Sequence, residues 1–400
     1  SSGKPTFLWN RLYQLIARAN VVIEKINTVA DGIYTTPNLK DHHKGEALFL
    51  RGFAHYYLWN YFGTAPVRTT RVVSQDDFTP TNSSGTELLD QAIQDFTEAA
   101  NLLPASWSSG NKGRVTKNSA YGFLGKCLVF KASATKNNAD YTAAIAAFNN
   151  ITGASLVPAF GDNFSATTEN NAESLFEVQA GNASSGNNVW LDNDFDNNIG
   201  DLSIFWGYYS NNFALFGQSR YFVTPKVVAA IDANDPRVPE TFDAANRNVT
   251  KYVLRDASGD VGSFNNYRVL RLADVKLLQA EAIVQSGGAT ADAISLINEV
   301  RTRARNMVPG GTFPENYSTA ETNRTTIMDW IIKERLIELA GEGQRWLDIR
   351  RWHLQGILNL NSAFFNSNVP VSFEAPKHLL LPIPTSELDV NPNMSQNDGY

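Results

Sequence analysis

Residues 334–352 interleave charged side chains closely with Leu, Ile and Trp. The acidic members are Glu334, Glu338, Glu342 and Asp348, and the basic members are Arg335, Arg345, Arg350 and Arg351. A carboxylate beside an arginine can serve in acid–base catalysis. The same charges can instead fix a corner between two helices, provided that each has a partner. We favour the architectural interpretation, because this stretch has no His or Cys and because neighbouring arginines keep carboxylates ionised.

Gly341 and Gly343 predict a bend in the middle of this stretch. Before the bend, apolar residues recur at helical spacing, and after it Trp346 and Ile349 are three apart. The i,i+3 spacing predicts two local ion pairs, Glu342 with Arg345 and Asp348 with Arg351.

Other patterns that carry chemistry are incomplete. Asp192, Asp194 and Asp196 alternate like the start of a calcium loop, but Asn197 replaces the turn glycine and Ser203 replaces the bidentate glutamate. We therefore predict no metal site and interpret these carboxylates as part of a solvated loop or as groups that bind hydroxyls. The five His residues form no metalloprotease motif, and the sequence has neither a phosphate loop nor a Gly-x-Ser-x-Gly motif.

The bulk composition is that of a globular protein. The chain has 400 residues, 43% of them hydrophobic, enough for a substantial core. A net charge of -6 and the absence of a basic face argue against nucleic-acid binding. The single Cys127 lies in an apolar stretch, so we expect a buried thiol and no disulfide within the chain. No cofactor is predicted.

Apolar residues recur at helical spacing in most of the chain, so helices must position the charged and polar residues named above. The apolar stripes predict a mainly α fold in which helix 8–30 pairs with 44–62, 86–103 with 118–135, and 268–286 with 290–305, and helix 139–151 follows the second pair. Small residues interrupt several of these helices, a texture that resembles tetratricopeptide repeats and lets paired helices approach closely.

Between residues 153 and 267 the stripes largely vanish, and Gly, Asn, Ser and Asp become frequent. We expect a short β segment at 174–179 and one helix, Pro225 to Ala233. The sequence thus predicts a single domain over 1–400, with a helical scaffold (1–152 and 268–360), an irregular ligand-binding insertion (153–267) and a loop-rich C-terminal tail (361–400). Long irregular insertions on a regular scaffold commonly carry binding function.

The chain resembles the SusD/RagB family of cell-surface nutrient-binding lipoproteins of Gram-negative bacteria. The resemblance lies in six segments that follow one another in the family's order: Trp9–Asn20, Glu46–Pro66, Asp235-Pro-Arg237, Tyr267–Ala282, Glu334–Trp352 and Leu380–Tyr400. It implies tetratricopeptide-like helix pairs with an irregular insertion. It also implies a protein that binds oligosaccharide or polysaccharide without catalysis and partners a SusC-like TonB-dependent transporter of the outer membrane.

The N-terminus departs from the family pattern. The family's lipidated cysteine and the segment that carries it are absent from this chain, and the internal Cys127 is not expected to be the anchor. The start at Ser1-Ser-Gly-Lys suggests a chain that was processed or cut. Surface exposure at the outer membrane through a lipid anchor is therefore an implication of the resemblance.

A sugar site needs flat aromatic rings for the sugar faces and polar side chains for the hydroxyl rims. The insertion supplies both kinds of group at Trp190, Asp192 and Asp194 and again at Trp206, Tyr208 and Tyr209, which we predict as the ligand-binding residues. Tyr208 and Tyr209 alternate sides in an extended chain, so only one of them is expected to face the ligand. In the competing interpretation, these rings pack the insertion onto the scaffold.

The other tryptophans are expected to pack in the core: Trp9, Trp59, Trp330, Trp346 and Trp352, with Trp107 a minor candidate for binding. Three alternatives stay open: a peptide or other non-sugar nutrient as the ligand, a scaffold that binds only proteins, and a glycoside hydrolase that uses Asp192 and Asp196. The hydrolase requires two carboxyl groups at a fixed separation, which a sequence does not reveal.

Overall fold

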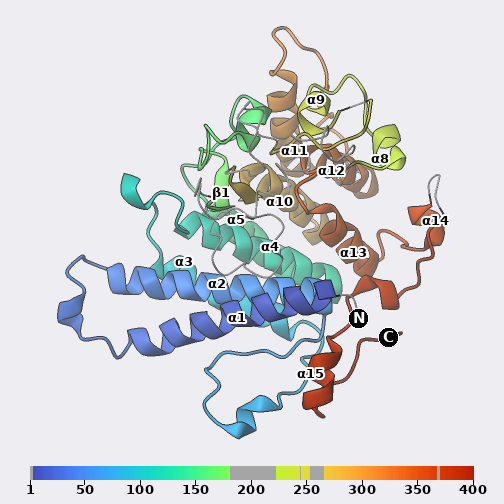
Figure 1. Ribbon diagram of the computed structural model, residues 1–400. Helices are drawn as coiled ribbons and strands as arrows, with labels where there is room; N and C mark the ends of the chain where they lie inside the picture. The colour runs from blue at the N-terminus through green and yellow to red at the C-terminus, as the bar shows by residue number, and fades with distance from the viewer. Residues whose placement is uncertain (1–2, 181–221, 244, 253–264, 367–369) are drawn as a thin grey trace. The chain divides into compact units, whose positions relative to one another are not determined.

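The computed structural model describes residues 3–180, 222–243, 245–252, 265–366 and 370–400. The chain divides into two compact units (Figure 1). Unit 1 contains Ser1–Ser108, Val115–Ile151 and Leu347–Tyr400, and unit 2 contains Ser109–Arg114 and Thr152–Trp346. Unit 2 therefore combines residues that the sequence assigned partly to the scaffold and partly to the insertion. The division into scaffold, insertion and tail stays a prediction.

Unit 1 is built from helices that contact their neighbours in chain order: α1 (Gly3–Ile26), α2 (Leu39–Phe62), α3 (Glu87–Leu102), α4 (Lys117–Thr135) and α5 (Asn138–Asn149). Figure 1 shows α1 and α2 side by side as long rods. The predicted pairs of unit 1 form, and α2 also packs against α3 and α4 against α5. The expectation of a mainly α fold is confirmed.

The apolar stripes of the sequence form the core of unit 1. Leu12, Ile16 and Ala19 of α1 are buried. Phe49 of α2 meets Phe96 of α3 at 5.3 Å and Phe123 of α4 at 5.5 Å between ring centroids. Edge-to-face and offset contacts of this kind add to the free energy gained by burying apolar area.

A buried polar group connects the first three helices. Arg51 of α2 donates to both carboxylate oxygens of Asp95 on α3, at 2.9 and 2.6 Å, and to Oδ1 of Asn20 on α1, at 2.9 Å. Burial raises the pKa of Asp95, although Arg51 acts in the opposite direction. Each helix therefore supplies one member of a satisfied network, which fixes their register.

Unit 2 contains the two strands of the described residues, β1 (Ser174–Val178) and β2 (Tyr267–Arg271), which pair antiparallel. Helices α10 (Leu272–Ser286), α11 (Thr290–Arg305) and α12 (Arg324–Glu338) pack on one another. The sequence predicted a helix that begins at residue 268. This start is wrong, because residues 267–271 form β2 and the helix begins at Leu272. Pairing with β1 provides backbone partners that outweigh the helical spacing of Leu270.

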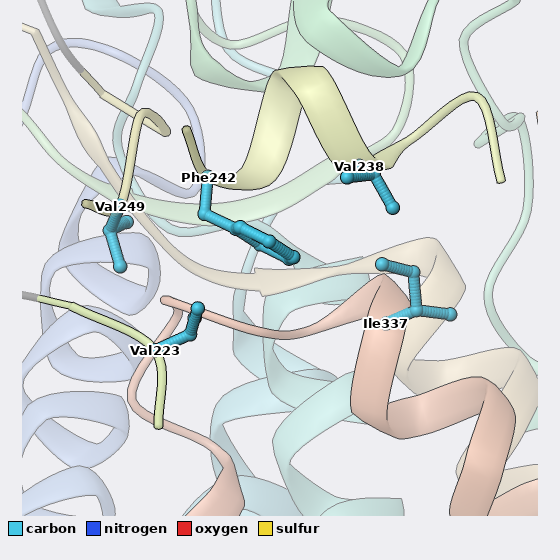
Figure 2. Packing of buried hydrophobic residues seen from close by; sticks show 5 residues of the cluster. All are labelled: Val223, Val238, Phe242, Val249 and Ile337. Atoms are coloured by element: carbon cyan, nitrogen blue, oxygen red, sulfur yellow. The ribbon is translucent and has the colours of Figure 1, made fainter. Parts of the chain in front are cut away.

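A small hydrophobic cluster holds residues 222–252 against α12 (Figure 2). Phe242 points between Val238 and Val249, and Ile337 of α12 faces them from below. Backbone bridges join Phe222 to Asn248 and Phe242 to Val249. Two short helices lie in this segment, α8 (Pro225–Ala230) and α9 (Val238–Thr241), so the expected helix from Pro225 ends three residues early.

Helix α13 (Arg345–Gln355) follows the predicted bend, where Gly341 and Gly343 adopt φ of +79° and +70°. The remaining elements are short helices, namely α14 (Ser362–Phe365), α15 (Thr385–Val390) and the 3-10 turns η1 (Asp31–Ile33), η2 (Gln75–Phe78), η3 (Ser109–Asn111), η4 (Phe160–Phe164) and η5 (Lys377–Leu379). None of the helices in the described part of the chain has the length and hydropathy needed to cross a bilayer.

Asparagine side chains bind the C-terminal tail to earlier residues of unit 1. Asn397 donates to the carbonyl oxygens of Phe62 at 2.9 Å and Leu381 at 2.8 Å. Asn391 and Asn393 donate to the carbonyls of Pro80 and Thr79, both at 2.8 Å. These bonds satisfy loop carbonyls that no helix or strand supplies with a donor.

Most tryptophans outside the insertion behave as expected. Trp9, Trp59 and Trp352 are buried, while Trp330 and Trp346 are partly buried. The Trp107 ring meets His42 at 5.4 Å, and its Nε1 donates to Val115 O at 2.8 Å. His42 and His43, expected in a loop, lie in the first turns of α2.

Gly125 tests the close approach of α4 and α5. A Cβ at this position would lie 2.3 Å from Cε1 of Phe148. We expect Gly125→Ala to lower the free energy of unfolding by about 1–3 kcal/mol, because overpacking outweighs the gain in helix propensity of about 1 kcal/mol. Urea unfolding measures the change. Gly32→Ala is the control, because a methyl group at that position would have no other atom within 4 Å; equal effects of the two substitutions would contradict this packing.

Candidate functional site

The predicted ligand-binding residues Trp190, Asp192, Asp194, Trp206, Tyr208 and Tyr209 lie outside the described residues, as does Asp196. Their roles stay predictions. The structure does describe the four chain ends between which the two undescribed segments of unit 2, residues 181–221 and 253–264, must run. These ends are residues 180, 222, 252 and 265.

Residues 180 and 265 lie next to each other at one end of the two-stranded sheet. Val178 of β1 is paired with Tyr267 of β2, and the backbone N–H of Ala180 donates to Oδ1 of Asn266 at 2.7 Å. Nδ2 of Asn266 donates to Glu177 at 2.8 Å. The side chain of Asn266 thus joins the residues that precede segment 181–221 to the residues that follow segment 253–264.

The other two ends are also held. Phe222 is bridged to Asn248, and Tyr252 is buried against Phe164 with ring centroids 5.2 Å apart. Nδ2 of Asn265 donates to the carbonyl of Phe164 at 2.6 Å. The base of the insertion is therefore ordered by specific contacts at each of its four ends.

Residues next to these ends belong to a group of buried ion pairs, which we call the ionic cluster. Its members are five cations and five carboxylates, each less than a tenth exposed: Arg237, Lys251, Arg271, Arg301, Arg303, Glu173, Asp235, Glu334, Glu338 and Glu342. The formal charges cancel. Burying unpaired charges costs several kcal/mol each, so such a group is tolerated only when its members are paired.

Glu338 on α12 is the centre of the cluster. Arg271 donates to it at 2.6 Å and Arg237 at 2.8 Å, and Arg303 also bonds to it. Burial alone would raise the pKa of Glu338, but the charges of Arg303, Arg271 and Arg237 hold that pKa well below its ordinary value. This carboxylate is therefore ionised at neutral pH.

Arg271, at the end of β2, connects three carboxylates. Its guanidinium forms a bidentate pair with Glu342, both bonds 2.8 Å, and also reaches Glu173 at 2.8 Å and Glu338. Burial acts to lower the pKa of Arg271, but these carboxylates raise it well above its ordinary value. A planar donor fork suits this arrangement, which a lysine would not reproduce.

The predicted pair between Glu342 and Arg345 is wrong. Glu342 bonds to Arg271 and to Lys251, the latter at 2.8 Å. Gly343, in the left-handed conformation, separates Glu342 from the helix that begins at Arg345, so i,i+3 geometry does not apply. Burial lowers the pKa of Lys251 to about 8, against the opposing effect of Glu342.

The Asp-Pro-Arg motif is tied into the same cluster. Arg237 holds Asp235 at 2.7 Å and reaches α12 through Glu334 at 2.6 Å. Arg301 of α11 bonds to the other oxygen of Glu334 at 2.8 Å. The two arginines that share this carboxylate lie 97 and 33 positions from it in sequence, and sequence spacing gives no signal for such partners.

The second predicted pair is confirmed, in unit 1. Arg351 donates to Oδ1 of Asp348 at 2.9 Å. Next to it, Arg350 lies 4.4 Å above the ring of Trp59, and burial lowers its pKa to about 10. The basic residues after the bend thus pack within unit 1, as the architectural interpretation expects.

The hollows among the described residues include three of different character. One in unit 2, about 790 Å³, is lined by polar side chains such as Asn298, Thr302 and Asn306, and no aromatic ring contributes to it. One in unit 1, about 600 Å³, is an apolar groove between α1 and α2. The other in unit 1, also about 600 Å³, combines rings with charged groups. Among the described residues no group of three or more His, Cys, Asp or Glu is arranged to hold a metal ion.

Removing the central carboxylate should be costly. We expect Glu338→Gln to lower the free energy of unfolding by about 3–5 kcal/mol, because three arginines lose their common counter-charge while still buried. Chemical denaturation followed by fluorescence measures the loss. Asp329→Asn, on the exposed face of the same helix, is the matched control and should change stability by less than about 0.5 kcal/mol. A small loss for Glu338→Gln would contradict the cluster geometry.

The same carboxylate predicts a pH dependence. Because the native pKa of Glu338 lies below the unfolded value of about 4.5, the unfolded chain binds a proton first as the pH falls. Stability is therefore fully present above that value and is lost as the pH drops below it. His55 in unit 1, with its pKa lowered by burial to about 3, adds a loss of the same sign below about pH 6.5.

Denaturation between pH 7 and pH 3 should show both losses in the wild type, and the Glu338→Gln variant should lack the steeper part below pH 4.5. Parallel curves for the two proteins would exclude Glu338 as its origin.

Comparison with known proteins finds SusD-like relatives that align along the whole chain. The model of the SusD family matches residues 247–400, and a family described as "Starch-binding associating with outer membrane" matches residues 1–128. SusD-like protein P38 of Formosa agariphila is 26% identical over 98% of this chain and 79% of its own length, and SusD-like protein P2 of the same organism is 27% identical over 100% and 81%.

Solved structures share the fold. A SusD homolog from Bacteroides thetaiotaomicron superimposes with a TM-score of 0.77 at 22% identity, over 100% of this chain and 86% of the other. A structure described as a laminarin binding SusD-like protein gives 0.73 at 24% identity, over 98% and 85%. The segments that carry the two family matches include residues 252 and 265, the members of the ionic cluster from Lys251 onward and the tail. The chain belongs to the SusD/RagB family.

Proposed function

We propose that this protein binds oligosaccharide or polysaccharide at the outer surface of the outer membrane and passes it to a SusC-like TonB-dependent transporter, without catalysis. The observation that carries the proposal is the match to SusD-like proteins along the whole chain. Structural neighbours of the same fold include a laminarin binding SusD-like protein and surface glycan-binding protein A from Bacteroides uniformis. Family membership supports the proposed lipid anchor, surface location and transporter partner.

The ligand is proposed to contact Trp190 and Trp206, one of Tyr208 and Tyr209, and the carboxylates of Asp192 and Asp194. Two features support this assignment. The segment is rich in rings and short polar side chains, the combination that sugars require. Its ends are fixed by the sheet, by Asn266 and by buried rings, which limits the conformational entropy that a ligand must remove.

A binding protein and a hydrolase make opposite demands on carboxylates. A hydrolase needs one carboxyl group that stays protonated near neutral pH. The carboxylates of the ionic cluster are held between arginines, and the pKa of its central member is lowered rather than raised. The ionic cluster is therefore unsuited to be the acid–base pair of a hydrolase. Recovery of intact oligosaccharide after prolonged incubation would test the proposal of binding without turnover.

Titration calorimetry with maltoheptaose and laminariheptaose tests the proposal. We expect the Trp190→Ala and Trp206→Ala variants each to bind about ten-fold more weakly, a loss of about 1.4 kcal/mol, with an unchanged melting temperature. Phe7→Ala, an exposed aromatic of α1, is the control and should bind as the wild type does.

A fall in melting temperature without a loss of affinity would mean that the two tryptophans pack the insertion. Binding of peptides in place of every glycan tested would replace the sugar by a non-sugar nutrient.

A further inference from the structure

A cavity of about 600 Å³ in unit 1 lies apart from the insertion in sequence. Its walls come from α1, from the loop after α2 and from α15, and its lining includes Tyr13, Asn20, Arg68, Phe78, Glu387 and Met394. The volume is within the range of sites for small ligands. None of these residues belongs to the ligand-binding set predicted from the sequence.

Two opposite charges line this cavity without pairing with each other. Glu387 has neither a hydrogen-bond nor an ion-pair partner for its carboxylate among the described residues. Arg68 uses Nη2 on the carbonyl oxygen of Asp77, which leaves Nε and Nη1 available. The neighbouring Arg71 is different, because Glu24 holds it through two bonds of 2.6 and 2.9 Å.

Tyr13 places a hydroxyl beside both charges. It donates to the carbonyl of Pro66 at 2.7 Å, so its oxygen can still accept a hydrogen bond. Burial raises the pKa of Tyr13 well above its ordinary value; Arg68 acts to lower that pKa and Glu387 to raise it. The hydroxyl therefore stays protonated at neutral pH and interacts electrostatically with both charged side chains.

Aromatic rings contribute to the apolar lining of the cavity. Trp9 packs on Tyr13 with centroids 4.8 Å apart and an interplanar angle of 49°. Phe78 is 61% exposed, which leaves a flat ring surface open to a ligand. Rings next to a donor, an acceptor and a hydroxyl are the set that holds a pyranose face and its rim.

The free charges decide between two kinds of occupant. An apolar side chain of a protein partner would bury the Glu387 carboxylate without a hydrogen bond and would leave Nε and Nη1 of Arg68 without acceptors, which is unfavourable. Two neighbouring hydroxyls of a sugar can satisfy both, one donating to the carboxylate and one accepting from the guanidinium. We propose that this cavity is a second saccharide site, which holds one or two sugar units of the same polysaccharide. The proposal rests on the proposed glycan-binding function.

The test uses maltoheptaose and laminariheptaose as probes and starts from the Trp190→Ala/Trp206→Ala double variant. Ligand-observed NMR measures the binding that remains at millimolar concentrations. We expect residual binding that Glu387→Gln weakens at least ten-fold. Glu374→Gln, the same substitution at an exposed position of unit 1 without side-chain partners, should leave it unchanged. A crystal soaked with the same probe should show sugar density between Phe78 and Glu387.

Several results would overturn the second site. If the wild type binds and the double variant has no residual binding, the proposed function stands and the second site fails. If residual binding survives Glu387→Gln, or if Glu374→Gln weakens it equally, the residual sugar lies elsewhere. If peptides rather than either sugar compete at Glu387, the occupant is a protein segment. If the wild type binds no glycan at all, both proposals fail together.

Discussion

The buried charge of Glu338 is the constraint on which unit 2 depends. A carboxylate with no exposed surface remains ionised only if cations surround it, and Arg237, Arg271 and Arg303 come from three separate segments. The cluster therefore forms only when the Asp-Pro-Arg turn, the end of β2, α11 and α12 meet with their side chains in one geometry. Apolar packing tolerates small shifts between elements, but a buried bidentate arginine does not. We interpret the cluster as a device that sets register more than as a source of stability.

This constraint gives the acidic residues of the 334–352 stretch a structural role. Glu334, Glu338 and Glu342 occupy one face of α12 and the bend after it, and their partners anchor the segments that lead into the insertion. Lys251 and Tyr252 directly precede one undescribed segment, while Asn265 and Asn266 directly follow it. The contacts of Lys251 and Asn265 therefore fix both attachment points of this segment. The tail has an equivalent role in unit 1, where Asn397 joins the end of α2 to the residues after η5.

Much of the fold follows from the sequence, because apolar periodicity and helix caps are local properties. The stripe of Leu12, Ile16 and Ala19 predicted α1 and its buried face, and Gly341 and Gly343 predicted the bend. Partners that are distant in sequence could not be predicted in this way. Residues 267–271 have helical spacing but pair with β1, and Glu342 has Arg345 three residues away but binds Arg271. The cavity with Glu387 was missed for the same reason, because its walls come from three separate parts of the sequence.

Hydrogen exchange tests the central claim most directly, by comparing Glu338→Gln with the Asp329→Asn control. If the cluster holds the base of the insertion together, the amides of β1, β2 and α9 will exchange faster by a common factor in Glu338→Gln. Those of α2 in unit 1 will keep the exchange rates of the control. Faster exchange confined to α12 around position 338, with β1 and β2 unchanged, would contradict the account.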